Sequence, residues 1–150
     1  MTNIEPSKEK LRQTVEVFWE SFPPFWHRIR AHIRQAAEQY DISVEQFHIL
    51  RHIRRGICSV SELAEAKTIS RPAVSQAVEA LVQKGLIERS PGDRDRRFIQ
   101  LALTESGNNL LDSVIDSTRQ WMVELLEPLN EDELDWLIRG MDALKKIKQI

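Results

Sequence analysis

The segment from Leu86 to Leu103 constrains the fold most, because it is where the chain departs from helical periodicity. The letters LIERS are followed by the turn-forming residues PGD and then, after RDRR, by FIQLAL. Ile99, Leu101 and Leu103 alternate with polar or smaller residues, which predicts a strand that is half-buried on one face. Because Pro-Gly-Asp is typical of a tight turn, the segment predicts a two-stranded hairpin.

Apolar residues elsewhere recur every three or four positions, which predicts helices. The first helical segment runs from about Ser7 to Tyr40, and Pro23 and Pro24 interrupt it. Proline lacks a backbone N–H and disfavours helix at the preceding residue. We therefore expect a kink or a break near Phe22, with Pro24 opening a second piece of helix.

Short polar residues stand where further helices should begin, and they are expected to cap them: Ser43, Ser61, Ser70 and Thr104. Ser43 and Gln46 have the spacing of a capping box, and Gly85 suits the position after the helix that starts at Ser70. Helical spacing also predicts a last helix from about Glu131 to Lys148. The order predicts a mostly α fold in which a helix-turn-helix is followed by a β-hairpin wing. Thr68 stands where such a turn usually has glycine.

The charge distribution points to a local binding surface. The chain has 21 Lys and Arg against 23 Asp and Glu, a net charge of −2. Between Arg51 and Arg97 the count is ten against six, so a basic middle lies between acidic ends. The net charge argues against a protein that coats nucleic acid nonspecifically, and the basic middle allows a local contact with it.

Other classes of function find little support. No Gly-rich loop and no Ser, His and Asp arrangement indicates an enzyme, and no cofactor motif is present. His48 and His52 are four residues apart, as two metal ligands can be, but no third ligand completes a set, so we predict no metal. Without a membrane-length apolar run or a secretory signal, we expect a soluble cytoplasmic protein with no membrane partner. A redox role for Cys58 stays open beside that of a small buried residue.

The wing tip and the helix after the turn supply candidate DNA contacts. Arginine suits the narrow, negative minor groove, and an aspartate two residues earlier can orient it. At the tip these are Arg94, Asp95, Arg96 and Arg97. The alternative for Arg97 is a pair with Asp95 that only stiffens the hairpin, and the alternative for Arg94 and Arg96 is that they are solvated. The outward positions in the first two turns of the helix after the turn, the recognition helix, are Arg71, Pro72, Ala73, Ser75, Gln76 and Glu79. Ser70 is expected to cap this helix and can also bond a phosphate. Arg71 can read guanine or hold a phosphate, Gln76 can pair with adenine, and Ala73 can touch a thymine methyl.

The sequence resembles the MarR family of winged helix-turn-helix transcription regulators. The resemblance rests on KGLIER, on the DRR of residues 95–97 and on LTESG, with SVEQFHILRHI and SVSELAEAKTISRPAVSQAVEAL in the same order upstream. It implies a homodimer built by residues 1–40 and 105–150, with a DNA-binding domain at 41–104. Members often carry a cation near Gln76, which this chain lacks.

The resemblance also implies an effector pocket between the dimerisation helices and the winged domain, for a small aromatic or anionic compound. Candidate lining residues are Trp19, Phe22, Trp26, Phe47, His48 and Arg51. Ordinary core and dimer packing remains an alternative for each of them. We therefore predict a homodimeric repressor that binds a pseudo-palindromic operator in double-stranded DNA and is released by an effector. The alternative is a winged-helix protein-interaction module that does not bind DNA.

Overall fold

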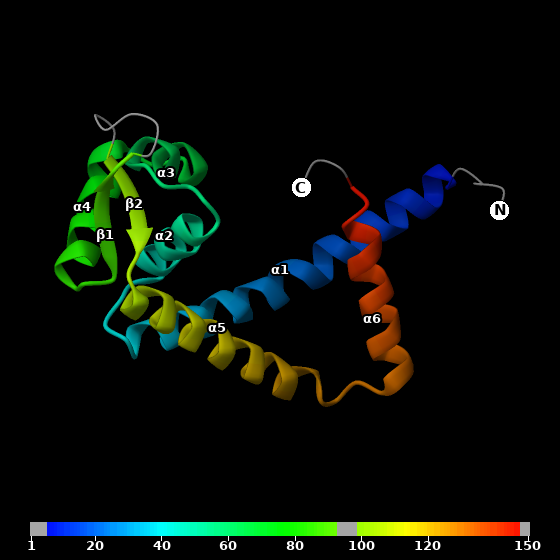
Figure 1. Cartoon of the computed structure of the whole chain (residues 1–150). Helices are drawn as coiled ribbons and strands as arrows, with labels where there is room; N and C mark the ends of the chain where they lie inside the picture. Colours follow the sequence, from blue (N-terminus) through cyan, green and yellow to red (C-terminus); the bar gives the residue numbers. More distant parts are fainter. Residues whose placement is uncertain (1–5, 93–98, 148–150) are drawn as a thin grey trace. The chain divides into compact units, whose positions relative to one another are not determined.

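The computed structural model describes residues 6–92 and 99–147. The order of elements is α1 (Lys8–Glu38), α2 (Val44–Arg54), α3 (Val60–Lys67), α4 (Arg71–Gln83), β1 (Ile87–Pro91), β2 (Ile99–Leu103), α5 (Glu105–Leu126) and α6 (Glu131–Leu144). Figure 1 shows α2, α3, α4 and both strands gathered at one end of α1. The predicted mostly α fold with a β-hairpin wing is confirmed, although α6 ends at Leu144 rather than near Lys148.

The chain divides into two compact units, the first ending at Thr118 and the second beginning at Arg119. The first unit holds the helix-turn-helix, the hairpin, α1 and most of α5, whereas the second holds the end of α5 and α6. This division reflects contacts within one chain and does not show which residues contact a second copy. The predicted division into a DNA-binding domain at 41–104 and a flanking dimerisation region therefore stays a prediction.

The helix starts follow the local sequence. Ser43 and Gln46 form the predicted capping box of α2, and the Ser70 hydroxyl accepts from the Ala73 N–H at 3.4 Å. The prediction that Ser61 caps the third helix is wrong. Ser59 is the cap of α3, because its hydroxyl and the Glu62 carboxylate accept each other's backbone N–H groups.

Of the kink or break predicted near Phe22, the break is wrong, because α1 continues through Pro23 and Pro24. The φ angle that proline imposes is compatible with a helix. The prolines remove the N–H donors that would normally bond the carbonyls of Trp19 and Glu20, four residues earlier. Both residues are exposed, so water can bond these carbonyls instead and the helix is not forced to end.

The core of the first unit lies between α2, α3, α4, the hairpin and the first half of α5. Its fully buried side chains include Phe47, Ile49, Leu50, Leu63, Val74, Val78, Leu81, Ile87, Leu101, Leu111 and Val114. The strands are antiparallel, with Ile87 opposite Leu103 and Pro91 opposite Ile99. Leu101 is buried as predicted, but Ile99 is 62% exposed, because the wing has left the core by that point.

The turn between α3 and α4 passes through Thr68, which has a φ of 55° and a ψ of 42°. This left-handed conformation costs a residue other than glycine about 1 kcal/mol or more. The turn joins two helices that each contribute side chains to the core. Leu63 and Ala64 are buried on α3, and Val74 is buried on α4. The observed turn shows that the chain accommodates threonine at this position despite the conformational cost.

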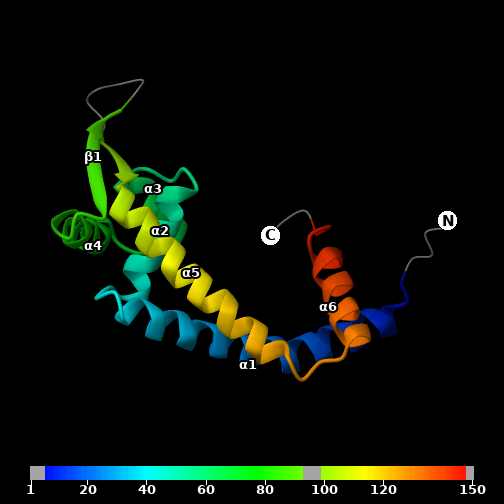
Figure 2. The ribbon, with the colours of Figure 1, turned by 60° about the horizontal axis from the view of Figure 1, so that its bottom comes forward.

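The LTESG segment joins the hairpin to α5. Thr104 Oγ1 donates to the Gly85 carbonyl at 2.6 Å and accepts from the Gly107 N–H at 3.0 Å. The Thr104 N–H also donates to the Leu86 carbonyl at 3.1 Å. Figure 2 shows α5 beginning directly at the end of the hairpin. Gly107 is buried, and a Cβ on it would lie 3.0 Å from the Leu86 carbonyl carbon and closer still to its oxygen.

We expect Gly107→Ala to lower the free energy of unfolding by about 2 kcal/mol or more, because the new methyl group must displace backbone atoms. Chemical denaturation followed by circular dichroism measures this loss. Ser106→Ala changes an exposed neighbour in the same helix turn and should alter stability by less than about 0.5 kcal/mol. Equal stability of the Gly107→Ala and wild-type chains would contradict the close approach.

Candidate nucleic-acid interface

The recognition helix α4 is amphipathic, with one buried apolar face and one exposed polar face. Val74, Val78 and Leu81 are buried, and α4 packs against α2, α3 and β1. The opposite face presents the predicted DNA-contacting side chains, all of which are exposed: Ser70, Arg71, Pro72, Ala73, Ser75 and Gln76. The structure therefore places these residues on one surface, while their contact with DNA stays a prediction. The predicted wing residues Arg94, Asp95, Arg96 and Arg97 lie outside the described residues.

One acidic side chain follows these residues on α4. Glu79 lies four residues after Ser75, and its Oε2 is 2.8 Å from Arg89 Nη2 on β1. Its other oxygen, Oε1, accepts from Gln83 Nε2 at 3.0 Å. The hydrogen bonds from Gln83 and Arg89, together with the Arg89 charge, hold the pKa of Glu79 below its usual value. Glu79 is thus ionised and paired rather than free to repel phosphates.

Sequence reasoning missed this link between helix and wing. The spacing of Glu79 and Gln83, four residues apart, indicates a contact on one helix face. The contact of Arg89 could not be predicted from neighbouring residues in the sequence, because its partner Glu79 lies on another element. Arg89 did belong to the KGLIER motif, but no function was attached to it.

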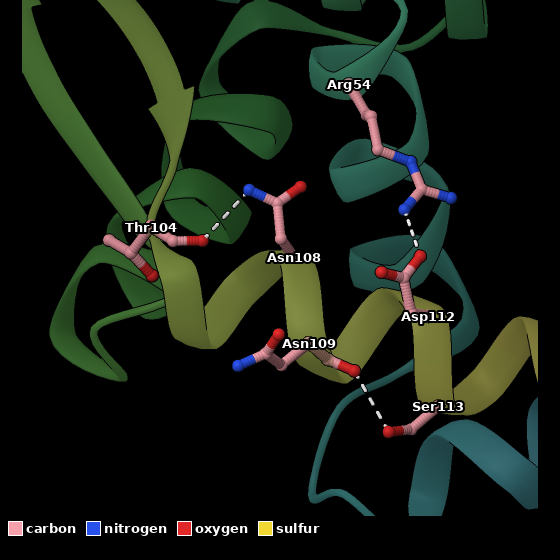
Figure 3. Close-up of polar contacts among 6 residues, drawn as sticks. All are labelled: Arg54, Thr104, Asn108, Asn109, Asp112 and Ser113. Carbon is pink, nitrogen blue, oxygen red and sulfur yellow. Dashed lines mark hydrogen bonds and ion pairs between the residues drawn. The ribbon is translucent and has the colours of Figure 1, made fainter.

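A second ion pair ties α2 to α5. Arg54 Nη1 contacts Asp112 Oδ1, and Figure 3 shows the two side chains pointing toward each other from their helices. In the same view, Asn108 donates to the Thr104 carbonyl at 3.2 Å and Ser113 to the Asn109 carbonyl at 2.9 Å. The pair helps to hold the first half of α5 against α2.

The predicted effector residues fall into two groups. On α2, the Phe47 and His48 rings lie 5.5 Å apart, and the Arg51 guanidinium carbon lies 5.9 Å from the Phe47 ring centre. On α1, the Phe22 ring stacks with the Trp26 ring at 6.3 Å. Phe47 is a core residue, only 1% exposed, whereas Trp19 is 74% exposed. Their place in one effector pocket stays a prediction.

His48 stands in a strongly positive environment. Burial and, after it, the charges of neighbouring basic groups together lower its pKa to about 4; these groups are Lys67, Arg51, Arg30 and His52. The imidazole is therefore neutral at pH 7. The structure reveals no cluster of three or more metal-binding side chains among the residues it describes. At Cys58, burial and the Glu62 charge raise the pKa of the thiol, which opposes formation of a reactive thiolate.

We expect the free energy of unfolding to fall as the pH drops from about 7 toward 4. The unfolded chain binds a proton at His48 near its ordinary pKa of 6.5, whereas the folded chain does so only near 4. His48→Gln should remove the contribution of His48 to the slope of the free energy of unfolding against pH. That contribution is below the limit of about 1.4 kcal/mol per pH unit for one proton, because the His48 side chain is partly solvated.

Denaturation at half-unit pH steps measures that slope. His27→Gln, at an exposed position of α1, controls for the loss of an imidazole elsewhere. An unchanged slope in His48→Gln would show that the low pKa is absent in solution.

In the described part of the chain, none of the helices has the length and apolar character needed to span a membrane.

Residues 40–97 match the model of the MarR family. The chain is 29% identical over 115 residues to the transcriptional repressor MdtR of Bacillus subtilis, covering 76% of this chain and 74% of the relative.

Two solved structures share the fold. Wild-type MarR from Escherichia coli is 22% identical, with a TM-score of 0.66 over 93% of this chain and 97% of that one. A mutant of MepR from S. aureus, bound to an oligodeoxyribonucleotide, is 24% identical, with a TM-score of 0.67 over 88% and 98% of the two chains.

Proposed function

Because the chain belongs to the MarR family of DNA-binding transcription regulators, we propose that it represses transcription as a homodimer on a pseudo-palindromic operator. The observation that carries this proposal is the exposed face of α4, where polar side chains and one arginine stand opposite a fully buried face. Two such helices in a dimer would enter successive major grooves, about 34–36 Å apart.

Exposed apolar side chains support the homodimer. Among the described residues of α6 none is buried, and Trp136 and Ile138 are 67% and 59% exposed. On α1, Leu11, Val15 and Phe18 are also exposed. Apolar surface of this kind marks a protein interface. A second copy of the chain would cover it, since dimer interfaces resemble a divided core.

The effector is a small aromatic or anionic compound. Its binding is supported by the aromatic rings on α1 and by the cationic groups around His48, which would favour an anion. The compound would release the operator by favouring a dimer whose recognition helices no longer match the groove spacing. We propose no catalytic role, in keeping with a family of regulators.

The test selects binding sites for the purified chain from a randomised duplex pool and then measures affinity across a salt series. We expect a palindromic site whose affinity falls steeply with salt. Arg71→Ala and Arg97→Ala should each weaken binding at least fivefold, because a good contact is worth about 1–3 kcal/mol.

Arg12→Ala removes an exposed arginine near the start of α1 and should leave the affinity within about twofold. Enrichment of no sequence, together with equal affinities for all variants, would contradict the proposal. The chain would then fit the alternative of a protein-interaction module that does not bind DNA.

The homodimer has its own test. Sedimentation of the wild-type chain at micromolar concentration should give twice the mass of one chain. Ile138→Glu should shift the equilibrium toward monomer by about tenfold or more, because a charge would be buried in an apolar interface. Gln120→Glu adds the same charge at an exposed polar position and should not. A monomeric wild-type chain would contradict the proposal.

A further inference from the structure

The ion pair between Glu79 and Arg89 connects the recognition helix α4 with the wing strand β1. Glu79 lies three residues after Gln76 and four after Ser75, so all three share one side of the helix. A free carboxylate at this place would face the phosphates and weaken their binding. Both of its oxygens instead have donors, Gln83 on the same helix and Arg89 on β1.

Arg89 connects two parts of the proposed interface. It lies in the middle of β1, opposite Leu101 of β2, and its guanidinium reaches back to α4. The Arg89 and Glu79 side chains are 38% and 48% exposed, so the pair lies at the surface. An arginine guanidinium suits this role because it is planar, always charged and directional in its hydrogen bonds.

We propose that Arg89 is a positioning residue for DNA binding, which acts through Glu79 to fix the wing strand β1 against the recognition helix α4. This inference rests on the proposed function. Two surfaces that must contact DNA together bind more tightly when they are held in place beforehand, because less freedom is lost on binding. The link does this for the wing and α4.

Two simpler roles for this pair predict different changes in DNA affinity when either residue is substituted. If Glu79 only repels phosphates, Glu79→Gln strengthens binding. If Arg89 contacts a phosphate directly, Arg89→Gln weakens binding whether or not Glu79 is present. If Arg89 acts through Glu79, either substitution weakens binding, and the second adds nothing once the first is made.

The experiment measures dissociation constants of the full chain for its selected operator and for a scrambled duplex. The proteins are the wild type, Glu79→Gln, Arg89→Gln and the double variant. We expect each single variant to bind the operator about fivefold more weakly, the upper range for a partly exposed ion pair, and the double variant to match them. Binding to the scrambled duplex should change less than about twofold, which a loss of folded protein would not produce.

Two further variants sharpen the result. Lys84→Gln breaks another surface ion pair, in which Lys84 Nζ lies 3.0 Å from Asp41 Oδ2 and the two side chains are 33% and 98% exposed. It should leave operator affinity within about twofold. The exchange of charges, Glu79→Arg with Arg89→Glu, restores a pair in reverse and should recover most of the affinity, even where a single variant folds poorly.

Tighter operator binding by Glu79→Gln, or a double variant weaker than both single ones, would overturn the inference. Equal loss on both duplexes would do the same, since it indicates damage to the fold or a nonspecific phosphate contact. If the wild type binds and all variants match it, only this inference fails. If the wild type selects no operator, the proposed function fails first, and the inference fails with it.

Discussion

The close approach of α5 to the backbone at Leu86 is the constraint on which the winged unit depends. The chain must leave β2, cap a new helix and pass the start of β1 within a few residues. Thr104 makes this possible with its hydroxyl and N–H, and Gly107 does so by having no side chain. The hairpin, the end of α4 and the start of α5 are thereby held at one point, so the recognition helix has a firm support.

Features that depend on neighbouring residues could be predicted from the sequence, and features that depend on distant ones could not. The capping box at Ser43 needs only Gln46. The same rule would have selected Ser59 over Ser61, because Glu62 follows Ser59 at the required spacing while Ala64, after Ser61, has no acceptor. The proline rule failed since it considers donors within the helix and not the water that an exposed segment can use.

The candidate site shows the same division. Helical periodicity was enough to place Arg71, Ser75 and Gln76 on an exposed face, because Val74 and Val78 fix the buried one. The partner of Glu79 could not be read from spacing, since Arg89 reaches it only after the chain has turned into the hairpin. Likewise, the low pKa of His48 depends first on its burial and then on basic groups from three different helices.

The adjacent prolines of α1 also restrict how this helix can be covered. The carbonyls of Trp19 and Glu20 lack their usual helical donors, and they lie among exposed apolar side chains such as Phe18. A buried carbonyl without a donor is costly. Any surface that packs over this stretch must therefore bring N–H or O–H groups of its own or enclose ordered water. A dry, purely apolar seam cannot run the full length of α1.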